Sequence, residues 1–71
     1  MAQQASFNPP LRVEQRWPGA EVRCVLIYAI DGGAAFCVEE ASQEFPRWMS
    51  VTEIDFAGVN EARRVRESAG A

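Results

Sequence analysis

The sequence predicts a mainly β fold at the margin of α+β: a small antiparallel sheet of roughly three to five strands followed by a short C-terminal helix. Two observations predict it. Apolar residues alternate with polar ones or form short β-branched runs over residues 11–17 and 22–40. Pro18-Gly19 and Gly32-Gly33 interrupt these segments as turns. The chain has 71 residues, so we place a single small domain at residues 11–68.

Residues 1–10 are polar and end in two consecutive prolines, so we expect a flexible N-terminal arm there. This end has no basic region followed by an apolar segment, so we expect no signal peptide. No run approaches the roughly 18 apolar residues of a membrane span. We therefore expect a cytoplasmic protein without a membrane partner, in which Cys24 and Cys37 are thiols.

The segment LRVEQRW, residues 11–17, is the first predicted strand because Leu11, Val13 and Trp17 alternate with charged residues. A direct return with Trp17 opposite Ala20 places two ion pairs on the outer side: Glu21 with Arg16 and Arg23 with Glu14. The same register adds three residues to the buried side: Val22, Cys24 and Leu26.

A second hairpin turns at Asp31-Gly32-Gly33 and leads to a third strand at about residues 34–40. Ordinary hairpin registers put Cys24, Leu26 and Tyr28 on one side with Ala35 and Cys37. The other side then carries four large apolar residues: Val25, Ile27, Phe36 and Val38. Burying them is worth about 6–12 kcal/mol at roughly 1.5–3 each, against about 5–15 of net stability for a domain. We expect a cover for this side: barrel closure, the C-terminal segment or a second copy.

The C-terminal third permits two interpretations. We favour a strand at Arg47–Val51, a turn at residues 52–54, and a helix over about 60–68 with Asn60 as its N-cap. In the alternative, Ser50 and Glu53 form a capping box that opens one longer helix. Its apolar stripe would consist of Val51, Ile54, Gly58, Ala62 and Val65.

Short antiparallel strands, tight turns and a strand ending in RWMSV followed by TEI make this layout similar to an SH3-like small β-barrel over about residues 11–56. The resemblance is one of pattern. Many unrelated functions use small barrels, so it implies no activity.

The chain has no histidine and no lysine, which excludes Ser-His-Asp triads, histidine metal sites, Schiff-base lysines and Walker lysines. Two cysteines are too few for a structural zinc site, and the carboxylates lack a metal-binding spacing. We therefore expect no metal and no cofactor, and we lean against an enzyme. The net charge of −3 disfavours a nucleic-acid partner.

Three groups of residues are candidates for binding. Val25, Ile27, Phe36 and Val38 form a candidate interface. Arg47 and Trp48, with Tyr28, are candidate contacts for a ligand or partner, because aromatic and arginine side chains dominate interface energetics. Arg63, Arg64 and Arg66 form a basic cluster that suits an anion.

These features lead to a hypothesis of an interaction module without enzymatic activity that associates with copies of itself through an apolar sheet face. One alternative is a small-molecule or enzymatic site at an oligomer interface, lined by Trp48, Tyr28 and carboxylates. Another is weak nucleic-acid binding through the C-terminal arginines. Another protein is a further candidate partner, and the size and composition suit an accessory protein of a phage or mobile element.

Overall fold

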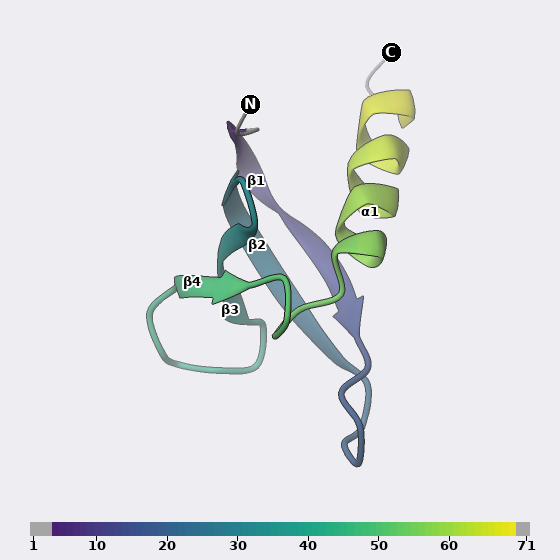
Figure 1. Cartoon of the computed structure of the whole chain (residues 1–71). Coiled ribbons are helices and arrows are strands. Elements are labelled where there is room, and N and C mark those ends of the chain that lie inside the picture. Colours follow the sequence, from purple (N-terminus) through teal and green to yellow (C-terminus); the bar gives the residue numbers. More distant parts are fainter. Residues whose placement is uncertain (1–3, 70–71) are drawn as a thin grey trace.

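The computed structural model describes residues 4–69 and consists of one sheet and one helix (Figure 1). The strands are β1 (Gln4–Gln15), β2 (Arg23–Asp31), β3 (Ala34–Glu39) and β4 (Arg47–Ser50), and the helix is α1 (Phe56–Ala69). The strands form a four-stranded antiparallel sheet in the order β1-β2-β3-β4. The prediction of a mainly β fold with a C-terminal helix is confirmed.

The predicted pairing of the first two strands is wrong by one residue. Val13 lies opposite Val25 and Leu11 opposite Ile27. The turn is also longer than a two-residue hairpin: residues 16–22 lie outside the strands, and Ala20 N–H donates to Trp17 O at 3.0 Å. Pro-Gly does not suit a two-residue hairpin, and a slip of one residue exchanges the two faces of a strand.

The corrected register buries the β-branched residues of β2. Val25 and Ile27 are 1% and 0% exposed, whereas Cys24 and Leu26 are only partly buried. The predicted partner of Arg23 changes accordingly. Arg23 pairs with Glu39 at 3.3 Å instead of with Glu14.

The hairpin between β2 and β3 turns at residues 32–33, as predicted, with Gly32 at a φ of 62°. A bulge follows, because Ile27 lies opposite Cys37 while Ala29 lies opposite Phe36. The extra residue, Tyr28, changes the alternation of β2. It lets Ile30 return to the buried side, where it is 4% exposed.

Residues 4–10, predicted as a flexible arm, belong to β1. The pairs Gln4–Asp31, Ala5–Ile30 and Ser6–Ala29 join this part of the strand to β2. The register is interrupted between Ser6 and Leu11, and Phe7 in this interruption packs against the core. The proline pair therefore marks an irregularity inside a long strand and not the start of the sheet.

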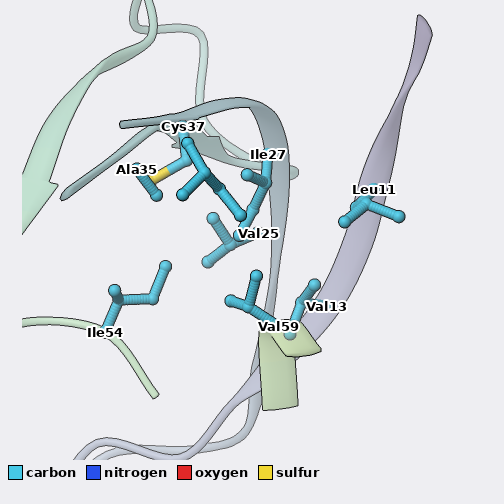
Figure 2. Packing of buried hydrophobic residues seen from close by; sticks show 9 residues of the cluster. Leu11, Val13, Val25, Ile27, Ala35, Cys37, Ile54 and Val59 are labelled. Carbon is cyan, nitrogen blue, oxygen red and sulfur yellow. The ribbon is translucent and has the colours of Figure 1, made fainter. Parts of the chain in front are cut away.

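The hydrophobic core lies between one face of the curved sheet, which we call the inner face, and the segment that leads into α1 (Figure 2). The sheet contributes seven residues: Leu11, Val13, Val25, Ile27, Ile30, Ala35 and Cys37. Ile54 and Val59 complete the cluster from the C-terminal segment. The chain thus covers its inner face with its own last third.

Helix α1 begins four residues earlier than predicted. Asp55 caps it, since the Asp55 side chain accepts a hydrogen bond from Ala57 N–H at 3.0 Å. Asn60 therefore lies inside the helix. Gly58 faces β1, where a Cβ would make an ordinary van der Waals contact of 3.5 Å with Val13 Cγ1. The alternative of a helix opening at Ser50 is wrong, since Ser50 ends β4.

One buried polar side chain connects β1 to this helix. Gln15 is 1% exposed, and its Oε1 accepts a hydrogen bond from Asp55 N–H at 2.7 Å. Its Nε2 donates to Glu14 O at 3.1 Å. Gln15 was the polar exception in the alternating strand, and these bonds explain its burial.

Within residues 4–69, α1 is the only helix, and it is neither long nor apolar enough to cross a membrane.

Candidate functional site

The sheet has a second apolar face, opposite the core, which we call the outer face. It carries Leu26, Phe36, Val38 and Trp48. Residues paired across antiparallel strands point to the same side, and the pairs Leu26–Val38 and Phe36–Trp48 establish these positions. Trp48 is 52% exposed, and the other three side chains are partly buried. Large apolar groups on both faces are thus a property of the folded sheet.

Two of these side chains form an aromatic pair. The ring centroids of Phe36 and Trp48 are 5.3 Å apart, with an angle of 46° between the ring planes. This is the tilted arrangement that aromatic pairs favour. The pair joins β3 to β4 and presents one broad aromatic surface with the tryptophan partly in solvent.

An ion pair borders the outer face on the side of β1. Arg12, which lies opposite Leu26, pairs with Glu40 through Nε and Oε2 at 2.5 Å, with a second contact at 3.2 Å. The hydrogen bond from Arg12 lowers the pKa of Glu40, and the hydrogen bond to Glu40 raises the pKa of Arg12. These two charges cancel, and Glu14, which lies opposite Cys24 on the same side of β1, adds one negative charge to this border.

The structure divides the four residues of the candidate interface. Phe36 and Val38 lie on the outer face, while Val25 and Ile27 are in the core of the same chain. The prediction that all four share one side of the hairpin is wrong because the bulge at Tyr28 shifts the pairing of β2 with β3 by one residue. On the outer face, Leu26 and Trp48 accompany Phe36 and Val38 in place of Val25 and Ile27.

Arg47, Trp48 and Tyr28 do not form one site. Successive residues of a strand point to opposite faces, so Arg47 lies on the inner side and Trp48 on the outer side. Tyr28 is 36% exposed on β2 and is separated from β4 by β3. The predicted contact set is therefore distributed over two surfaces.

A cleft of about 240 Å³ opens on the inner side, beside the loop between β3 and β4. Trp17, Phe45 and Met49 provide its apolar walls, and Phe45 is 90% exposed. Glu44 and Arg47 contribute opposite charges. Glu39, which pairs with Arg23, is the third charged residue of the lining. The apolar walls fit a small apolar group.

Cys37 contributes to this cleft, but its environment does not favour nucleophilic chemistry. The residue is 0% exposed, and burial raises the pKa of its thiol. A protonated thiol is a poor nucleophile. Cys24 lies on the outer side of β2, so the two free cysteines are not placed for a disulfide across the hairpin, contrary to the predicted shared face.

Two of the three arginines of α1 contact β1, and the third pairs within the helix. Arg66 donates hydrogen bonds to the carbonyl oxygens of Pro9 and Pro10, the latter at 3.0 Å. Arg64 pairs with Glu61. The guanidinium of Arg63 lies 5.7 Å from the centroid of the Phe7 ring. Arg63 and Arg66 therefore attach the helix to β1, which the sequence alone did not indicate.

Among residues 4–69 there is no cluster of three or more metal-ligating side chains. No protein-family model matches this chain, and no curated protein or solved structure matches it. The similarity to an SH3-like barrel accordingly stays a prediction from the sequence pattern.

Proposed function

We propose that this chain is an interaction module without enzymatic activity that pairs with a second copy of itself through the outer face. The observation that carries the proposal is an apolar outer face built from Leu26, Phe36, Val38 and Trp48. Helix α1 packs against β1, and Ile54 and Val59 lie in the core (Figure 1). The last third of the chain therefore covers the inner face.

The charge on this surface favours a second copy as the partner. A twofold interface brings identical patches together, so a patch with a net charge would repel itself. Arg12 and Glu40 neutralise each other at the border, and the centre is apolar. The apolar centre of the outer face can therefore meet its own copy without bringing like charges together.

The size of the chain is consistent with such an interface. A typical specific interface buries about 800 Å² per partner, roughly one sixth of the 5103 Å² of accessible surface of this chain. One face of a four-stranded sheet supplies a surface of this order. Trp48 is the expected anchor, because tryptophan is enriched among residues that dominate binding energy.

Two substitutions test the proposal. Trp48→Ser removes the anchor, and Val38→Thr replaces a methyl group by a hydroxyl at nearly constant volume. Loss of an anchor residue costs about 2 kcal/mol or more, so Trp48→Ser should raise the dimer Kd by roughly 30-fold. The matched control is Val65→Thr, a position on α1 that is 60% exposed and lies beside β1, at the opposite edge of the sheet from Trp48.

Sedimentation equilibrium over a range of concentrations measures the Kd of each variant. The proposal predicts a weakened dimer for Trp48→Ser and Val38→Thr and an unchanged one for Val65→Thr. A native chain that stays monomeric at every concentration, or variants that all dimerise like the native chain, would refute it. Circular dichroism confirms that each variant is folded.

The cleft beside Trp17 and Phe45 supports a second candidate function, the binding of a small apolar molecule. An aromatic side chain that is 90% exposed at the rim of a 240 Å³ cleft is the observation that favours it. A thermal-shift screen of aromatic metabolites tests this function, and Phe45→Ser should abolish any stabilisation that is found. A cytoplasmic location, in which Cys24 and Cys37 stay reduced, fits both functions.

A further inference from the structure

Strand β4 lies at one edge of the sheet. Among residues 4–69, strand β4 has a neighbouring strand on one side only, and Val51 N–H donates to Gly33 O at 2.9 Å just beyond its end. In an antiparallel pair, every second residue directs both its N–H and C=O toward the partner strand. Trp48 and Ser50 therefore direct their backbone groups away from β3, to the edge where another strand could add.

Glu53 occupies both edge groups of Ser50. The Ser50 N–H donates to Glu53 Oε2 at 3.0 Å, and the Glu53 N–H donates to Ser50 O at 2.9 Å. These two residues are the capping-box pair of the sequence. In the folded chain they close a strand edge and do not open a helix.

A hydrogen bond from Trp17 also fixes the Glu53 backbone. The indole Nε1 of Trp17 donates to Glu53 O at 2.9 Å, across a separation of 36 residues. Within the turn, the hydroxyl groups of Ser50 and Thr52 are 2.7 Å apart and hydrogen-bonded. The chain thus fixes the Glu53 backbone, while the side chain is free to adopt the position that covers Ser50.

The other end of the edge is limited by a proline. Pro46 precedes β4 and has no N–H to donate. Between Pro46 and the capped Ser50, Trp48 is the one residue of β4 that retains both outward backbone groups. Two antiparallel copies of β4 centred on Trp48 would then share only its two reciprocal hydrogen bonds.

We propose that Glu53 closes a latent strand-addition site on β4, and that the strand this site takes when opened is β4 of a second copy. A twofold arrangement places Trp48 opposite Trp48, and a freed Ser50 N–H then reaches Pro46 O of the other copy. Removing the Glu53 side chain increases the hydrogen bonds across this edge from two to four. The native chain therefore avoids edge pairing and keeps the outer face as its association surface.

The test compares Glu53→Ala and Glu53→Asp with Glu53→Gln. Alanine lacks the acceptor and aspartate is one methylene too short, whereas glutamine keeps an oxygen at the same reach. Two measurements are made on each: amide hydrogen exchange at Ser50 and molar mass against concentration. We expect exchange at Ser50 to accelerate about tenfold in the first two variants, since a hydrogen bond to a charged group is lost. Glutamine should accelerate exchange less than alanine and aspartate do, because it keeps an acceptor oxygen and loses only the charge.

Assembly through the edge is separated from pairing through the outer face by adding Val38→Thr to Glu53→Ala. The inference predicts concentration-dependent assembly in this double variant, because the edge does not use the Val38 side chain. Unchanged exchange at Ser50 in both Glu53→Ala and Glu53→Asp would overturn the inference. A double variant that exchanges faster at Ser50 but stays monomeric would overturn it as well. A monomeric single Val38→Thr variant bears only on the proposed function.

Discussion

Removing the Gln15 side chain tests most sharply whether its hydrogen bond with Asp55 holds α1 on the sheet. It is 1% exposed and accepts the hydrogen bond from Asp55 N–H at 2.7 Å, next to the start of α1. Gln15→Ala leaves this N–H without its partner and leaves a cavity between β1 and the helix. We therefore expect the change to reduce the free energy of unfolding.

The magnitude follows from the two losses. An unsatisfied buried donor costs about 1–3 kcal/mol, and the cavity adds roughly 1 kcal/mol, so the sum is about 2–4 kcal/mol. For a domain of this size each kilocalorie lowers Tm by about 4–8 °C. The midpoint of thermal unfolding should therefore fall by at least about 8 °C.

Urea unfolding followed by circular dichroism measures the free energy, and the slope of the transition should stay unchanged. Gln43→Ala is the matched control, because Gln43 is exposed in the loop between β3 and β4. Its effect should be within about 0.5 kcal/mol of zero. A Gln15→Ala variant that behaves like this control would show that the bond to Asp55 does not hold the helix on the sheet.

Four further predictions concern titration, thiol reactivity and backbone conformation. Burial raises the folded-state pKa of Cys37. The stabilisation that the protonated thiol gives is therefore complete below the unfolded-state pKa and is lost as pH rises toward the folded-state pKa. Urea unfolding above pH 9 should show this fall in the free energy of unfolding, and a Cys37→Ala variant should not. A thiol reagent should also modify Cys24 before Cys37, and equal rates would contradict the burial. The hydrogen bond with Arg12 lowers the folded-state pKa of Glu40. The stabilisation that the ionised carboxylate gives is therefore present above the unfolded-state pKa and is lost as pH falls through the folded-state pKa. Glu40→Gln should reduce the loss of stability at acid pH, as measured by urea unfolding. Gly58→Ala should stabilise the chain by up to about 1 kcal/mol, because alanine favours the helix and its Cβ would make contacts of 3.4 Å or longer. Gly19→Ala should destabilise the chain by about 1 kcal/mol, because Gly19 has a φ of 76°. The opposite order of the two melting temperatures would contradict the assigned turn.

The sequence was sufficient to predict the strands from residue 11 onward and the two hairpins that join the first three, because alternation and the turn glycines are local signals, but it missed residues 4–10 of β1. It was insufficient for the register between β1 and β2. The loop around Pro18-Gly19 is longer than a two-residue turn, and the ion pairs available to Arg23 satisfied the wrong register as well as the right one. The bulge at Tyr28 has no signal in the sequence.

The candidate site was predicted in kind but only partly in its residues. A second apolar face was expected, and the folded sheet has one, with Phe36 and Val38 on it. Leu26 was assigned to the core because faces follow from register. The Ser50–Glu53 motif was recognised, but whether it starts a helix or ends a strand depends on the pairing of β4 with β3, which is not local.

The basic cluster illustrates the same limit. Arg66 was available for an anion on the basis of sequence, but its partners are the carbonyl oxygens of Pro9 and Pro10, more than fifty residues away. These carbonyls were assigned to a flexible arm. Only the fold brings the helix and the first strand together, so the contact was not accessible from either segment alone.

The most direct test of the central claim is the molar mass of the native chain in solution, measured by size-exclusion chromatography with light scattering at two concentrations under reducing conditions. Pairing through the outer face predicts a mass of twice 7.9 kDa at the higher concentration, and a return to 7.9 kDa for Trp48→Ser. A native chain of 7.9 kDa at both concentrations would contradict the claim. The outer face would then be stable in water without a second copy.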